Sequence, residues 1–142
     1  MKSTLGGFVP VHSLGISQIV AYGAMFYSFA QIKVELAEKL GMSLETTTMI
    51  VSLSLFINVL ISSYVGYLID RYGGLKVLST GLFIGSIGFI SLYFTEDLLG
   101  FLFSMLLIGI SFSSASYNVA FSTAIQLDDQ KSRKNINIIT FY

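Results

Sequence analysis

One short segment brings together small and charged residues that could act in a turn between two membrane helices. It reads Gly66-Tyr67-Leu68-Ile69-Asp70-Arg71-Tyr72-Gly73-Gly74-Leu75-Lys76. Asp70 falls near the predicted C-terminal end of a helix, where the helix dipole disfavours a carboxylate that has no partner. Gly73 and Gly74 can take the positive φ that ends a helix in a tight turn. Arg71 and Lys76 can anchor this turn at the membrane–water boundary.

Small residues recur at helical spacing in three places. Ser62 precedes Gly66 by four residues, and glycines at 81, 85 and 88 and a Gly109/Ser113 pair repeat the pattern. Small residues at this spacing let the backbones of membrane helices approach closely. We expect these faces to pack within the chain, with a homodimer through the glycines at 81–88 as the alternative.

Uncharged polar side chains inside otherwise apolar stretches are the remaining candidates for binding. Solutes and coupling ions in membrane transporters meet such groups near the middle of the bilayer. Interhelical hydrogen bonding is the alternative role for each of them, and a tyrosine can also anchor a helix at the interface. Gln18 and Gln31 lie near the ends of their stretch and are expected to face lipid headgroups. The candidates are Gln18, Tyr22, Tyr27, Gln31, Asn58, Tyr117 and Asn118.

The composition indicates which elements must position these residues. Of the 142 residues, 54% are apolar and only 11% are charged, and the mean hydropathy is +0.76. Soluble domains carry about 25% charged residues. The formal net charge of +0 gives no basic field for a nucleic-acid backbone. A soluble enzyme and a nucleic-acid-binding protein are therefore poor fits.

Catalytic and cofactor motifs are missing from the sequence. There is no cysteine and only one histidine, His12, so neither a thiolate metal site nor a credible Ser-His-Asp set can form. No glycine-rich phosphate loop with a lysine is present. We expect no enzyme activity, no metal and no cofactor.

Four stretches without a charged residue are long enough to cross a bilayer, which takes about 20 apolar residues. They cover residues 3–32, 46–69, 77–95 and 98–127. The first apolar stretch is too long for the core of a signal peptide. The sequence predicts an all-α polytopic membrane protein with helices near 14–38, 46–69, 76–95 and 98–125.

Apolar residues resume after Lys134 but only eight residues follow it. We interpret them as the start of a truncated fifth span, from about residue 134. An amphipathic tail on the membrane surface is the alternative.

The distribution of cations predicts an orientation. Short loops on the cytoplasmic side are enriched in Lys and Arg. With four spans, six cations fall on the side of the N-terminus and two, Lys33 and Lys39, on the other side. The N-terminus is therefore expected in the cytoplasm. The six are Lys2, Arg71, Lys76, Lys131, Arg133 and Lys134.

The segment from Gly66 to Lys76 resembles the signature loop of the major facilitator superfamily, in the turn after the second span. Residues 22–29 and 35–43 are similar to bacterial members near the monocarboxylate porters, and residues 116–121 and 131–134 resemble the end of the fourth span and the loop after it. One departure is Leu75, where related loops often have a second basic residue. The resemblance implies a partial N-terminal half of that fold in the inner cell membrane.

The resemblance also implies roles for particular residues. Gly66, Asp70, Arg71, Gly73 and Lys76 would form a conformational latch between two halves of a transporter. The first and fourth helices would line the central cavity, which places Tyr22, Tyr27 and Tyr117 above Asn58 as candidates. The candidate cavity lining is Tyr22, Tyr27, Tyr117 and Asn118. The partners would be the lipid bilayer, the missing C-terminal half and a small solute such as an organic anion.

Three functional interpretations remain open from the sequence. The leading one is a truncated N-terminal piece of a facilitator, which does not transport by itself. The second is a complete four-helix transporter acting as a dimer, although the first helix has no membrane-embedded glutamate before Glu35. The third is a membrane protein that binds a partner without transporting.

Overall fold

The computed structural model describes residues 11–127 and 132–141, and these residues form helices joined by short turns. The chain begins with α1 (Val11–Tyr22), a π-helical segment (Gly23–Tyr27) and α2 (Ser28–Lys39). Two long helices follow, α3 (Leu44–Tyr72) and α4 (Gly74–Phe94). The last three helices are α5 (Leu98–Ser114), α6 (Tyr117–Leu127) and α7 (Ser132–Thr140). No strand occurs within the described ranges, which confirms the all-α prediction.

Three helical segments are long and apolar enough to cross a membrane. They are α3, α4 and the combined run of α5 and α6, Leu98–Gln126. They match the predicted spans at 46–69, 76–95 and 98–125 within a few residues. The remaining predicted span, residues 14–38 at the start of the chain, is helical throughout. The π-helical segment divides it into α1 and α2, each of which is too short to cross a membrane alone. That span stays a prediction.

Side chains at the helix ends account for where two of the helices begin. The Thr46 backbone N–H donates to Ser43 Oγ at 3.1 Å at the start of α3. The Gly100 backbone N–H donates to Asp97 Oδ1 at 2.9 Å at the start of α5. Each bond satisfies one of the free N–H groups of a first helical turn. These caps set the short turns that force α2 against α3 and α4 against α5.

Apolar side chains cover the outside of the bundle, whereas serines and small residues fill much of the inside. Phe56, Phe83 and Tyr93 are among the large exposed side chains. Ser104 and Ser111 are completely buried. This distribution is typical of a protein in a lipid bilayer. Apolar side chains on the outside can contact lipid chains, and small residues inside let the helices pack closely.

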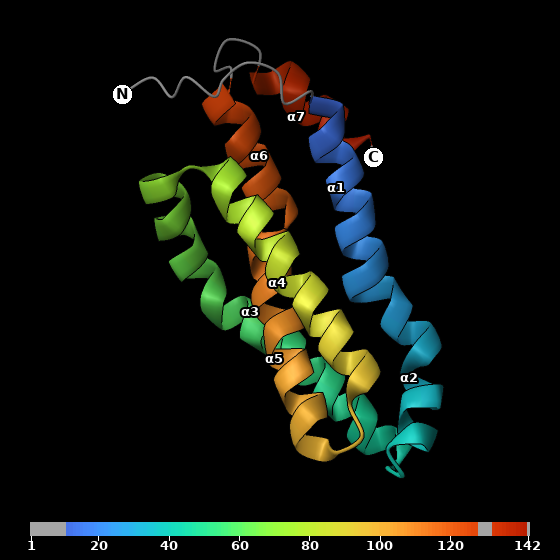
Figure 1. Cartoon of the computed structure of the whole chain (residues 1–142). Coiled ribbons are helices and arrows are strands. Elements are labelled where there is room, and N and C mark those ends of the chain that lie inside the picture. Colours follow the sequence, from blue (N-terminus) through green and yellow to red (C-terminus); the bar gives the residue numbers. More distant parts are fainter. Residues whose placement is uncertain (1–10, 128–131, 142) are drawn as a thin grey trace.

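A glycine seam joins α4 to α5 and α6, which lie beside it in Figure 1. A Cβ atom added to Gly81 would lie 2.5 Å from Ser114 Cβ, and one added to Gly88 would lie 2.8 Å from Ile108 Cγ1. The Ser111 hydroxyl donates to the Gly81 carbonyl at 2.6 Å across this contact. The predicted packing of these glycines within the chain is confirmed. We call this contact the α4 seam, formed by Gly74, Gly81, Gly85 and Gly88 against Thr123, Ser114, Ser111 and Ile108.

The last helix lies at the end of the bundle where α1 begins (Figure 1). α7 packs against α1 and α6, with Ile139 fully buried and Asn135 nearly so. The predicted fifth span from about residue 134 coincides with α7. Its assignment as the start of a span or as a surface tail stays open. Of the cations used to predict the orientation, Lys2 and Lys131 lie outside the described residues.

Candidate functional site

The turn between α3 and α4 consists of a single residue, Gly73. Its backbone has φ 89° and ψ 143°, a conformation that side-chain-bearing residues rarely adopt. Its N–H donates to the Ile69 carbonyl at 2.9 Å, which closes α3. The next residue is held by α6, because the Gly74 N–H donates to Gln126 Oε1 at 2.8 Å. The predicted glycine turn is therefore present and is fixed against the last turn of the membrane run.

The two charged residues before this turn have different surroundings. The Arg71 guanidinium donates to the Tyr67 hydroxyl at 2.8 Å and lies 5.4 Å from the centre of the Tyr72 ring. Asp70 is exposed and makes no hydrogen bond or ion pair with any described residue. The neighbouring arginine thus interacts with tyrosines rather than with the carboxylate. A partner for Asp70, if it has one, must come from outside the described residues.

Four residues at spacings of four form an open ridge on α3: Asn58, Ser62, Gly66 and Asp70. Residues four apart lie on one face of a helix. A Cβ atom added to Gly66 would have no heavy atom within 4 Å, so this glycine has no packing partner among the described residues. We call these four residues the α3 ridge. Its small and polar surface is uncovered, in contrast to the α4 seam.

A polar cavity of about 360 Å³ lies beside the α3 ridge. Tyr22 from α1, Asn58 from α3 and Asn118 from α6 contribute to its wall. Ser113 also lines the cavity, but its hydroxyl is buried and has no hydrogen-bond partner in the described structure. Burying a hydroxyl without a partner costs free energy, about 1–3 kcal/mol. Binding of water or a solute in the cavity would therefore depend on its other polar side chains. Its other polar lining residues are Ser62, Ser116 and Ser122.

The structure places the sequence candidates unequally. Tyr22 and Asn118 line the cavity, whereas Tyr117 packs on the Tyr22 ring with centroids 5.0 Å apart and does not line it. Tyr27 is 66% exposed and packs edge-on against Phe26, away from the cavity lining. Asn58, which was ranked below the tyrosines, does line it. The signal that identifies Asn58 is its position in the series of residues spaced by four on α3.

One expectation for a glutamine was wrong. Gln18 was expected to face headgroups but is completely buried, and its Oε1 atom has no partner in the described structure. α7 and α6 both pack against α1, the helix that carries this side chain. Gln31 is exposed, as its predicted place at a span end implies.

Among the described residues, no group of three or more His, Cys, Asp or Glu side chains could hold a metal ion. The site therefore consists of a polar cavity, an uncovered ridge and a glycine turn with charged flanks. It is carried by long apolar helices, which defines a polytopic membrane protein with a polar internal surface.

The family model of the Major Facilitator Superfamily matches residues 14–127. The chain belongs to this superfamily of membrane transporters. No curated protein and no solved structure matches the chain.

Proposed function

We propose that this chain acts in the transport of a small solute and that the polar cavity faces the solute path. The polar lining of the cavity carries this proposal, because it lies within an otherwise apolar bundle and has the buried, unpaired Ser113 hydroxyl behind it. Polar groups inside the membrane are costly and are retained mainly for function. Asn58, Tyr22 and Asn118 supply amide and hydroxyl groups beside it.

The solute that we propose is a small organic anion. Hydroxyl and amide N–H groups can donate to carboxylate oxygens. Hydrogen bonds to a charged acceptor are stronger than neutral ones. No charged side chain lines the cavity among the described residues, so binding of the anion would rest on these donors. The similarity of residues 22–29 and 35–43 to members near the monocarboxylate porters supports the same class of solute.

We further propose that Gly66, Asp70, Arg71, Gly73 and Lys76 form a conformational latch. The uncovered Gly66 leaves room for the backbone of another helix. The Asp70 carboxylate, one turn further on, is free to interact with the positive N-terminus of that helix or with a cation. Such a contact would steady one state of the transport cycle and would have to break in the other.

The cavity also supports a proposal about what else the transporter contains. Val59, Ser62, Gly66 and Asn118 in its lining are exposed, so one side of the cavity has no wall within the described residues. We propose that a C-terminal half supplies this wall and that residues 1–142 alone do not transport.

An uptake assay tests the solute and the second wall together. Cells expressing the chain with the continuation of its reading frame are compared with cells expressing residues 1–142, using labelled acetate, lactate and pyruvate. We expect uptake in the first case only, and Asn58→Leu should reduce it at least tenfold. Ser63→Leu is the matched control, because Ser63 is an exposed α3 residue that does not line the cavity. Uptake by residues 1–142 alone would contradict the second wall, and the absence of uptake of all three anions would contradict the solute class.

Thiol labelling tests the proposed orientation, in which the N-terminus and the α3–α4 turn lie in the cytoplasm of a cell with the protein in its inner membrane. The chain has no cysteine, so single cysteines can be introduced. Positions 72 and 96 suit this purpose because both are exposed and they flank α4, one at the last residue of α3 and the other just after α4 ends. An impermeant reagent should label Glu96→Cys in intact cells and Tyr72→Cys only after permeabilisation. The reverse pattern would contradict the orientation.

A further inference from the structure

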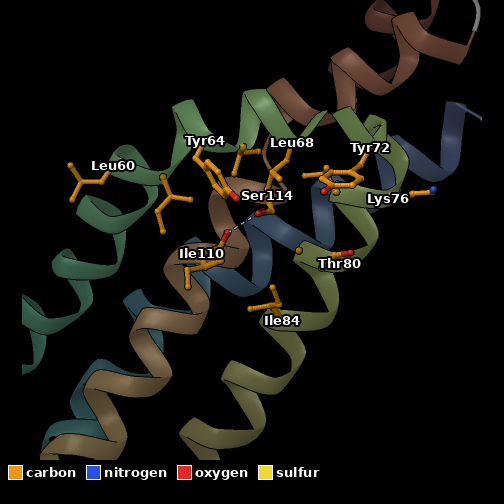
Figure 2. Close-up of a pocket in the computed structure, with 13 residues that line it drawn as sticks. Leu60, Tyr64, Leu68, Tyr72, Lys76, Thr80, Ile84, Ile110 and Ser114 are labelled. Atoms are coloured by element: carbon orange, nitrogen blue, oxygen red, sulfur yellow. Dashed lines mark hydrogen bonds between the residues drawn. The ribbon is translucent and has the colours of Figure 1, made fainter. Parts of the chain in front are cut away.

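An apolar groove of about 650 Å³ separates α3 from α4 on the outside of the bundle. Figure 2 shows Leu60, Tyr64 and Leu68 of α3 on one side of it and Thr80 and Ile84 of α4 on the other. Ile110 and Ser114 of α5 also line it. The Ser114 hydroxyl donates to the Ile110 carbonyl at 3.0 Å, so it does not offer a free polar group to the groove. The volume falls within the range of about 300–1,000 Å³ that is usual for ligand sites.

The position of the groove relates it to one leaflet of a bilayer. It begins where α3 ends and α4 begins, at Tyr72 and Lys76, and extends along α3 to Leu60. Twelve residues of α-helix cover about 18 Å. One leaflet of the hydrocarbon core is about 15 Å deep. The groove therefore has the length of one lipid chain that enters from the membrane surface.

The only charged side chain that lines the groove among the described residues is Lys76, at its outer end. Lys76 is exposed and makes no hydrogen bond or ion pair with a described residue. In Figure 2 its ammonium points away from the apolar part, beyond the Tyr72 ring. This arrangement places a cation where the headgroup of a lipid in the groove would lie. Within the described ranges, no acidic residue lines the groove to oppose an anion.

We propose that this groove binds an anionic phospholipid, with one acyl chain along α3 and α4 and its phosphate near Lys76. The apolar lining, the leaflet-length extent and the Lys76 cation at the outer end, which has no partner among the described residues, each fit that occupant. Clusters of basic residues at the membrane boundary attract anionic headgroups in the same way. The proposal is independent of the solute, because the groove and the polar cavity lie on different faces of α3 and share only Val65.

The absence of tryptophan from the chain makes a direct test possible. Tyr64→Trp places one fluorophore in the groove. Phe83→Trp is the matched control, because Phe83 is 67% exposed on α4 at a similar distance from the turn and does not line the groove. Each variant is reconstituted in phosphatidylcholine bilayers that contain either brominated phosphatidylglycerol or brominated phosphatidylcholine. Quenching of the tryptophan reports which lipid occupies the position.

At Tyr64→Trp, we expect phosphatidylglycerol to bind about fivefold more tightly than phosphatidylcholine, because this is the preference that one lysine near the membrane surface provides. At Phe83→Trp, we expect no preference between the two lipids. Adding Lys76→Gln should abolish the preference, and Lys76→Arg should retain it. Equal binding of the two lipids at Tyr64→Trp, or a preference that Lys76→Gln leaves unchanged, would overturn the proposal. Protection of Tyr64→Trp from both lipids while Phe83→Trp is quenched would also overturn it, because a further helix or a second copy would then fill the groove.

Discussion

The α4 seam and the α3 ridge are built from the same kinds of residue but differ in whether anything covers them. On the α4 seam, Gly81 packs so closely on α5 that a Cβ atom would lie 2.5 Å from Ser114 Cβ. On the α3 ridge, Gly66 has no neighbour within 4 Å among the described residues. Small residues at helical spacing therefore indicate that another helix can approach closely. They do not indicate whether that helix belongs to the same bundle.

The difference separates stability from function in this chain. The seam holds α4 against α5 and α6, so its residues should matter for folding. The ridge borders the polar cavity and ends at Asp70, which has no partner among the described residues, so the ridge residues are free to serve the transport cycle that we propose. Substitutions on the α4 seam and on the α3 ridge should therefore differ in their effect on the free energy of unfolding, and glycine-to-alanine substitutions should have opposite effects.

Adding one methyl group to a glycine should give opposite results on the two surfaces, and this is the largest expected effect. Gly81→Ala should lower the free energy of unfolding by about 2–3 kcal/mol, because the methyl group would also lie 3.0 Å from the Ser114 backbone carbonyl carbon. Gly66→Ala should raise it by about 0.5–1 kcal/mol, because alanine is the better helix former and has free space there. Titration with SDS in mixed micelles, followed by circular dichroism, measures both.

A second change sharpens the same comparison. Ser114→Gly in the Gly81→Ala background should recover part of the loss, because it removes the closer of the two contacts. Equal effects of alanine at positions 81 and 66 would contradict the distinction between a closed and an open surface.

The turn that connects the two surfaces should be the next most sensitive position. Gly73→Ala should cost about 1–2 kcal/mol, since the positive φ of 89° strains any residue with a Cβ. Gly41 also has a positive φ, 62°, with free space around it. Gly41→Asn is the control and should cost much less, because asparagine tolerates the left-handed conformation. Comparable losses at 41 and 73 in the same unfolding assay would contradict a special role for the α3–α4 turn.

The hydrogen bond that ties this turn to α6 should have a smaller effect. Gln126→Ala removes the acceptor of the Gly74 N–H and should cost about 1 kcal/mol. Gln31→Ala, an exposed glutamine of α2 without a hydrogen bond to a described residue, should leave the unfolding free energy unchanged. Hydrogen exchange at Gly74 offers a local measurement. Unchanged protection of that amide in Gln126→Ala would show that the bond does not hold the turn.

The sequence predicted the helical class, four spans of which three are confirmed, and the glycine turn, because these depend on local patterns of charge and apolar length. It also anticipated the packing of the glycines within the chain. It misplaced Gln18, because the burial of that side chain depends on which helices become neighbours. The place of Asn58 in the cavity lining depends on the same neighbours. Tyr27 and Tyr117 show the same limit. Their residue type suits a cavity, but the rotation of the first and fourth helical runs directs them elsewhere.

The water accessibility of two adjacent serines tests most directly whether the α3 ridge faces a solute path. Ser62 lines the polar cavity, whereas Ser63 is exposed on α3 but lines neither the cavity nor the groove. Thiols react as thiolates, which form in water and not in lipid. A methanethiosulfonate reagent should therefore modify Ser62→Cys at least tenfold faster than Ser63→Cys in bilayers. Equal rates, or faster modification of Ser63→Cys, would contradict the proposal that the α3 ridge borders a hydrated path.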